Sequence, residues 1–371
     1  MSGKRIIAVV TGSRADYGLL RPVIRAIDER EDARHEVIHT GAHHLGTSST
    51  AAEVEADFPS AAELAMTRPG SVGRIPDALA LLGGMAAFVH QFQESPPDVV
   101  LVLGDRIEAF AAAAAASVAG IRVAHMHGGD RAEGIADEAM RHAITKLAHI
   151  HLPATEESAQ RIIRMGEDPD RVHVVGSPAI DGLSDMPPLE DDRYEALGRP
   201  DIVFLLHPIG RDDESEYADA RRLLDTCRST GRVLALHPNH DPGRNGILRA
   251  IEKTTDLLHF PHLPRERFIG LLRRVKLIAG NSSAGLIECA ALPLWCINIG
   301  PRQSGREKPA NVIGCSESEL GQVENALRRA FSEPAPPYDG RYGRGEAGRR
   351  TADLLATFDS DKHPIRKRNT Y

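Results

Sequence analysis

The chain has 371 residues, of which 42% are hydrophobic and 26% are charged, and its formal net charge is −7. This length fits two domains of ordinary size, and the negative charge balance argues against nucleic acid as a general partner. No segment approaches the ~18 unbroken apolar residues of a membrane span, and no signal-peptide core precedes the first strand. We therefore expect a cytoplasmic protein that binds no membrane.

The first half of the chain alternates predicted strands and helices. Strands are expected at 5–11, 35–40, 99–103 and 122–125, and helices at 17–28, 76–92 and 107–119. Strands rich in Val, Ile and Leu between helices are typical of a parallel sheet with both faces covered. Ligands of such sheets bind at the carboxyl ends of the strands, and polar residues gather there at 12–17, 41–44, 104–106 and 125–130.

The pattern breaks at a polar, proline-bearing stretch and then restarts. Strands are expected again at 202–206, 233–236 and 277–279, with helices at 213–226, 265–272 and 346–358. We predict two doubly wound parallel-sheet domains of Rossmann-like type that face a cleft, at 1–184 and 201–345, with a linker at 185–200. The segment 346–371 holds a helix and a basic tail, and this segment could return to the first domain. The basic run at its end is typical of a solvated terminus.

The most distinctive motif is the turn Gly-Asn-Ser-Ser-Ala-Gly at 280–285, which follows an apolar strand. We expect this turn to open a helix whose first amides, together with Ser282 and Ser283, suit an anion. Capping alone explains the two serines equally well. Glu288 lies further along, where it suits a ribose diol. A second turn at 302–307 carries Arg302 and Arg306, and arginine forks match phosphate oxygens, so a nucleoside diphosphate is the predicted ligand.

No dinucleotide fingerprint and no P-loop lysine motif occurs in the chain, so neither NAD nor ATP is implied and no cofactor is expected. The four cysteines show no CxxC spacing, which indicates free, mostly buried thiols.

Carboxylates and imidazoles follow two predicted strands of the first half. Asp105 comes after the strand at 99–103, where capping of the next helix is its commoner role. His125, His127 and Asp130 follow the next strand, and Glu133, Asp137 and Glu138 come soon after. Groups of this kind at neighbouring strand ends can serve general acid and base catalysis. Their spacing matches no zinc signature, so we expect no metal site.

Six strings of residues, in order along the chain, resemble the UDP-N-acetylglucosamine 2-epimerases, and specifically the hydrolysing branch of sialic-acid biosynthesis. They lie at 11–18 (TGSRADYG), 104–106 (GDR), 141–149 (RHAITKLAH), 176–178 (GSP), 280–283 (GNSS) and 302–307 (RQSGRE). The resemblance runs from Arg5 to about Val312. It implies the two-domain glycosyltransferase-B architecture, with UDP held mostly by the second domain.

The resemblance also implies roles for individual residues. In the first domain, Ser13, Arg14 and Asp16 would contact the nucleotide, and Asp105, Arg106, Asp137 and Glu138 would work at the sugar. In the second domain the residues that would hold UDP are His207, Asn239, His262, Ser282, Ser283, Glu288 and Arg302. The expected partner is a nucleotide sugar, and the expected assembly is a homodimer or a homotetramer.

Family members remove the proton from C2 of the sugar and expel UDP from C1, which gives a 2-acetamidoglucal. Water then adds with the opposite configuration at C2, so that N-acetylmannosamine and UDP are released. Some members carry His-x-Glu-Gly-Gly with a catalytic glutamate, whereas this chain has His-Met-His-Gly-Gly at 125–129 and a Glu-Gly pair at 133–134. The candidates for the glutamate's role are His127, Asp130 and Glu133.

The main interpretation is a hydrolysing epimerase of UDP-N-acetylglucosamine. The alternatives are a hydrolysing epimerase of a UDP-2,4-diacetamido-trideoxyhexose, a non-hydrolysing UDP-N-acetylglucosamine epimerase, a glycosyltransferase of the same architecture, and an inactive nucleotide-sugar binding protein.

Overall fold

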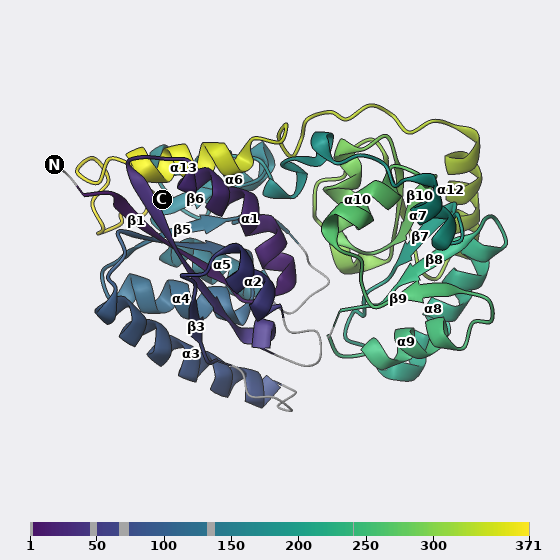
Figure 1. The fold of residues 1–371 in the computed structure, drawn as a ribbon, viewed down its shortest axis with the longest axis horizontal. Coiled ribbons are helices and arrows are strands. Elements are labelled where there is room, and N and C mark those ends of the chain that lie inside the picture. The colour runs from purple at the N-terminus through teal and green to yellow at the C-terminus, as the bar shows by residue number, and fades with distance from the viewer. Residues whose placement is uncertain (1–2, 45–49, 67–73, 132–137, 240, 371) are drawn as a thin grey trace. The chain divides into compact units, whose positions relative to one another are not determined.

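The computed structural model describes residues 3–44, 50–66, 74–131, 138–239 and 241–370, which form two compact units. Unit 1 comprises residues 1–130, 137–181 and 342–371, and unit 2 comprises residues 131–136 and 182–341. Each unit is built on a six-stranded sheet whose strand pairs are all parallel (Figure 1). The prediction of two doubly wound parallel-sheet domains is therefore confirmed.

In unit 1 the strands are β1 (Arg5–Thr11), β2 (Ala33–Thr40), β3 (Ala62–Leu64), β4 (Val99–Leu103), β5 (Arg122–Met126) and β6 (Ile150–Leu152). The helices are α1 (Arg14–Asp28), α2 (Ala51–Asp57), α3 (Arg74–Glu94), α4 (Ile107–Val118), α5 (Glu138–Leu147), α6 (Glu156–Arg164) and α13 (Ala347–Thr357). Short 3-10 turns are η1 (Gly41–His44), η2 (Pro169–Arg171) and η3 (Pro178–Ile180).

In unit 2 the strands are β7 (Ile202–Leu205), β8 (Val233–Leu236), β9 (Leu258–Phe260), β10 (Leu277–Gly280), β11 (Trp295–Ile299) and β12 (Val312–Cys315). The helices are α7 (Asp191–Ala196), α8 (Asp213–Arg228), α9 (Arg244–Glu252), α10 (Arg265–Leu272), α11 (Ser283–Leu286) and α12 (Leu320–Ser332). The 3-10 turns are η4 (Leu183–Asp185), η5 (Cys289–Ala291) and η6 (Pro301–Gln303). The segment predicted as a linker, 185–200, contains α7 and belongs to unit 2.

The two sheets share one topology. Their strand orders are β3-β2-β1-β4-β5-β6 and β12-β11-β10-β7-β8-β9. In each sheet the order reverses between two central strands, β1 and β4 in unit 1 and β7 and β10 in unit 2. Open α/β sheets bind ligands in the crevice at this switch point, outside the carboxyl ends of the strands. The loops after these four strands are therefore where the fold favours a site.

Alternation along β1 divides the core of unit 1 into two layers. Ile7 and Val9 pack with α1 and α13 on one face of the sheet, whereas Ala8 and Val10 pack with α3 and α4 on the other. Figure 1 shows these helix pairs on opposite sides of the sheet. In unit 2 a second core cluster joins the sheet to α8, α9 and α12. All four cysteines are free and buried, as predicted from their spacing.

The end of the chain packs on unit 1. Helix α13 contacts α1, and the Asp181 carboxylate accepts hydrogen bonds from the amides of Ala347 (3.0 Å) and Gly348 (2.6 Å) at the helix start. Gly348 permits this approach, since a Cβ there would lie 2.9 Å from the backbone carbonyl of Pro22 in α1.

The basic run near the C-terminus is solvated only in part. Lys362, Arg366 and Arg368 are exposed, as predicted, whereas Lys367 packs inward. Lys367 Nζ lies 2.6 Å from Glu167 Oε2, and Lys146 Nζ lies 2.6 Å from Glu167 Oε1. His151 Nε2 also contacts Glu167 Oε2 at 3.0 Å, and the Glu167 side chain is only 1% exposed. The tail is therefore tied to a buried carboxylate that lies 200 residues earlier in the sequence.

Among the described residues, α3 is the one helix that is long and apolar enough, over 75–94, to cross a membrane by its length and composition alone. Only 22% of that window is buried, yet the helix packs against α4 as one layer of an α/β unit. Ile75, Leu79 and Leu82 are 74%, 65% and 67% exposed. Their spacing of four and three residues places them on one face of the helix.

Candidate functional site

The switch point of unit 1 carries charged side chains from both of its loops. Ser13 caps α1, because its hydroxyl accepts from the Asp16 amide at 3.3 Å, and Arg14 is the first residue of that helix. Arg106, after β4, lies 3.9 Å from Asp16 and 3.2 Å from the buried Glu108. Burial raises the pKa of Asp16 to about 6, against the opposing effect of the Arg106 charge. This crevice therefore holds a cation between two carboxyl groups.

Asp105 does not cap α4. The N-cap position belongs to Arg106, which makes no side-chain cap bond, and Asp105 instead forms an ion pair with Arg141 of α5. Arg141 is 3% exposed, and its other guanidinium nitrogen donates to the carbonyl of Asp130 at 2.9 Å. One buried cation thus connects the loops after β4 and β5. Arg141 belongs to the motif at 141–149, but the sequence did not indicate its role in the site, because its partner lies 36 residues away.

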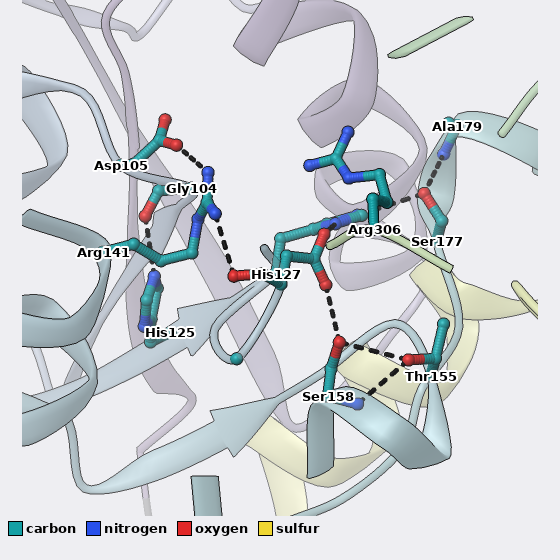
Figure 2. Close-up of polar contacts among 12 residues, drawn as sticks. Gly104, Asp105, His125, His127, Arg141, Thr155, Ser158, Ser177, Ala179 and Arg306 are labelled. Carbon is teal, nitrogen blue, oxygen red and sulfur yellow. Dashed lines mark hydrogen bonds and ion pairs between the residues drawn. The ribbon is translucent and has the colours of Figure 1, made fainter. Parts of the chain in front are cut away.

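The two imidazoles at the carboxyl end of β5, His125 within the strand and His127 just after it, have distinct environments (Figure 2). His125 is buried and donates from Nε2 to the carbonyl of Gly104 at 2.8 Å, while its Nδ1 lies 3.2 Å from the Thr145 hydroxyl. Burial lowers the pKa of His125 to about 3. His127 contacts Asp130 through Nδ1 at 2.8 Å and the Ser177 hydroxyl through Nε2 at 3.0 Å. Both nitrogens of His127 are therefore engaged.

The remaining carboxylates predicted for unit 1 are only partly placed. Glu138 is the first residue of α5, and its carboxylate lies 3.6 Å from His142 Nε2. Glu133 and Asp137 lie outside the described residues. Their predicted contribution to catalysis stays a prediction, as do the roles assigned to Asp105, Arg106, His127, Asp130 and Glu138.

The switch point of unit 2 centres on His207 and Asn281. The Asn281 side chain is 3% exposed and brackets the backbone of His207, since its oxygen accepts from the His207 amide at 2.7 Å and its nitrogen donates to the His207 carbonyl at 2.8 Å. The Asn239 amide donates to His207 Nδ1 at 3.1 Å. Because Nδ1 accepts, the neutral ring carries its proton on Nε2. Burial, and then the Arg302 charge, lower the pKa of His207 to about 3.

The loop after β11 is tied to the same asparagine. Gln303 Nε2 donates to the Asn281 carbonyl at 3.0 Å, and Arg302 Nη1 lies 3.5 Å from that oxygen. Arg302 also pairs with Asp241 at 3.7 Å. Asn281 therefore joins the loops after β7, β10 and β11. Asn281 lies inside the motif at 280–285 but was not among the predicted site residues, because its side chain holds backbone groups in place.

The helix that the turn at 280–285 was expected to open is present but short. Helix α11 covers only Ser283–Leu286, and η5 follows after a break. Ser282 caps it by accepting from the Ala284 amide at 3.3 Å. A single turn carries little of a helix dipole, so a long helix N-terminus is not available here as the main anion-binding device. The serine hydroxyls stay candidates for phosphate contacts.

The other predicted nucleotide contacts are spread over unit 2. Glu288 lies between α11 and η5 and pairs with Arg265 at 3.5 Å. His262 is exposed between β9 and α10. Arg306 donates to the side-chain oxygen of Gln303 at 3.1 Å. Among the residues that the structure describes, no group of three or more His, Cys, Asp or Glu side chains is arranged to hold a metal ion.

Comparison with known proteins gives this geometry a context. Residues 25–356 match the protein family described as UDP-N-acetylglucosamine 2-epimerase. A UDP-N,N'-diacetylbacillosamine 2-epimerase (hydrolyzing) of Legionella pneumophila is 35% identical over 377 residues, which span 99% of this chain and 100% of that protein. A UDP-N-acetylglucosamine 2-epimerase of Neisseria meningitidis is 32% identical over 342 residues, 89% of this chain and 88% of that one.

Solved structures agree on the fold. The UDP-GlcNAc 2-epimerase of Methanocaldococcus jannaschii, in complex with UDP-GlcNAc and UDP, superposes with a TM-score of 0.79 at 17% identity, over 94% of this chain and 99% of that one. The predicted glycosyltransferase-B type of fold is confirmed by this match.

Proposed function

The chain belongs to the UDP-N-acetylglucosamine 2-epimerase family, and we propose that it is a hydrolysing 2-epimerase of a UDP-2,4-diacetamido-trideoxyhexose. The observation that carries the choice of sugar is the 35% identity, over 99% of this chain, to an enzyme named for diacetylbacillosamine. The 32% identity to an enzyme named for UDP-N-acetylglucosamine keeps the main interpretation from the sequence as the second candidate. We also propose that the protein is cytoplasmic and forms a homodimer or a homotetramer. The exposed apolar face of α3 suits burial against a second copy of the chain.

The chemistry divides between the two units. In unit 2, His207, Ser282, Ser283 and Arg302 would stabilise UDP as the leaving group, with Asn239, His262 and Glu288 on the nucleoside. In unit 1, Ser13 and Arg14 would contact the diphosphate, and Asp16 would contact another part of the nucleotide sugar. Asp105, Arg106 and His127 would act at C1 and C2, where a proton is removed and later added from the opposite face. A C2 proton is barely acidic, so base, leaving-group stabilisation and solvent exclusion must act together.

Turnover in deuterated water tests the proposal. We expect a UDP-2,4-diacetamido-trideoxyhexose to give free UDP and a free sugar with deuterium at C2, both read by NMR. UDP-N-acetylglucosamine should react with a kcat/KM at least about tenfold lower, because polar groups arranged for the 4-acetamido substituent would be left unpaired. Equal or faster reaction of UDP-N-acetylglucosamine would favour the second candidate. A product still linked to UDP, or tight UDP binding without turnover, would contradict hydrolysis.

The tautomer of His207 gives a prediction about UDP affinity. The side-chain N–H group of Gln can occupy the position of the His207 Nε2–H donor, whereas the shorter side chain of Asn does not reach it. We expect His207→Gln to keep most of the UDP affinity and His207→Asn to lose about 10- to 100-fold, which is what one hydrogen bond to a charged group contributes. Isothermal titration calorimetry with UDP measures both. Equal losses in the two variants would show that His207 does not donate to the nucleotide.

A further inference from the structure

A chain of hydrogen bonds in unit 1 passes through five buried side chains and reaches His127 from both sides (Figure 2). Its members come from the loops after β5 and β6, from α6 and from the residue that caps η3, and they are Thr155, Ser158, Asp130, His127 and Ser177. Ser177 belongs to the Gly-Ser-Pro string of the family resemblance, for which the sequence indicated no function.

The donors and acceptors on the Asp130 side can be ordered. Thr155 Oγ1 accepts from the Ser158 amide and donates to Ser158 Oγ, both at 3.1 Å. The hydroxyl proton of Ser158 is then directed to Asp130 Oδ1, which lies 2.9 Å away. Asp130 accepts there and faces His127 through its other oxygen, an arrangement that suits an ionised carboxylate. His127 Nδ1 therefore carries a proton and donates it to Asp130.

The opposite side is compatible with this orientation. The Ala179 amide donates to one lone pair of Ser177 Oγ at 3.3 Å. Because Nε2 of a neutral ring protonated on Nδ1 carries no proton, the Ser177 hydroxyl donates to it at 3.0 Å. The Asp130 side of the chain therefore specifies the tautomer, and the Ser177 side accommodates it.

The backbone fixes the ring in this position. His127 has φ 60°, which is the left-handed region and costs a residue other than glycine about 1 kcal/mol or more. Gly129 has φ 74°, and a Cβ there would lie 2.3 Å from the Ser158 carbonyl oxygen. The Gly-Gly pair therefore lets the turn after β5 pack directly against the start of α6, where Ser158 lies.

We propose that Ser177 is a positioning residue for proton transfer by His127, and that Ser177, His127 and Asp130 act as one unit. The inference rests on the proposed function. Asp130 keeps Nδ1 protonated and stabilises the imidazolium that forms when Nε2 takes a proton. Ser177 holds the ring through Nε2 in the resting state, and its hydroxyl proton must turn away before the Nε2 lone pair can accept a proton. In this chain His127 then fills the role of the glutamate seen in other family members. The arrangement of hydroxyl, imidazole and carboxylate follows the general logic of activated acid–base groups.

The first test needs no turnover. Nitrogen-15 NMR of histidine-labelled protein should show His127 protonated on Nδ1 and unprotonated on Nε2 at neutral pH. Asp130→Asn should reverse this, because the Asn amide donates to Nδ1 and moves the proton to Nε2. Glu167→Gln is the matched control for Asp130→Asn, since both substitutions turn a buried carboxylate beside a histidine into an amide, and it should leave the tautomer of His127 unchanged. A wild-type ring protonated on Nε2 would overturn the proposal, whether or not any UDP-sugar is turned over.

The second test is kinetic. We expect Ser177→Ala to lower kcat by about 10²-fold, the lower end of what general acid–base catalysis contributes, with little change in KM. Ser177→Thr, which keeps a hydroxyl, should restore most of the loss. Wild-type kcat in Ser177→Ala would overturn the proposal, and so would failure of the threonine variant to recover activity while it remains folded by circular dichroism.

Discussion

Asp105→Asn is expected to lower kcat by about 10²- to 10⁴-fold, the range that general acid or base groups contribute, and to leave the Kd for UDP almost unchanged. Asp105 lies at the carboxyl end of β4, at the switch point of unit 1, and is paired with the buried Arg141. The substitution removes the charge but keeps the size of the side chain. Because the groups proposed to hold most of UDP lie in unit 2, binding should survive.

A carboxylate at the other end of the same strand supplies the control. Asp98 precedes β4, and its Oδ2 accepts from the Ile6 amide at 2.7 Å. Residues at the amino ends of parallel strands serve stability rather than chemistry, so Asp98→Asn should keep the wild-type kcat. Steady-state kinetics and calorimetry with UDP measure both variants. A tenfold or larger loss of UDP affinity in Asp105→Asn would contradict the proposed division of tasks between the two units.

The sequence was sufficient for the central strands of both sheets because these hydrophobic strands alternate with helices. Predicted strands such as 99–103 and 233–236 match β4 and β8 to the residue. It was also sufficient to place the polar loops at the carboxyl ends of these strands. The short strands β3, β6 and β9 went unpredicted, since three residues carry no periodicity that can be recognised. Strands β11 and β12 also went unpredicted.

The sequence did not indicate which side chains from distant segments contact each other. Arg141 is 36 residues from Asp105, and Ser177 is 50 residues from His127. A cap was the natural expectation for Asp105 because local pattern favours it, and only packing of α5 against the strand ends brings the guanidinium there. The sequence also did not indicate that the helix opened by the turn at 280–285 ends after Leu286, because tertiary packing rather than propensity decides where a short helix ends.

Removal of the charge on Glu167 is expected to destabilise the protein by about 3 kcal/mol, in the range measured when one partner of a buried ion pair is deleted. Glu167 lies between Lys146, Lys367 and His151, and Glu167→Gln would leave two ammonium groups close together without their carboxylate. Urea unfolding followed by circular dichroism measures the loss. Glu157→Gln is the control, because Glu157 is 62% exposed and pairs with Arg161 at the surface, where such a pair contributes less than about 1 kcal/mol.

The same carboxylate makes stability depend on pH. Burial alone would raise the pKa of Glu167, but hydrogen bonds from His151, Lys146 and Lys367 outweigh it and lower the pKa from 4.5 to about 2. A lowered folded-state pKa stabilises the protein above pH 4.5, and this contribution disappears as the pH falls towards 2. The wild type should therefore lose about 3 kcal/mol over that interval from this group, and Glu167→Gln should not. Parallel acid-unfolding curves for the two proteins would show that the tail is held by something other than this buried charge.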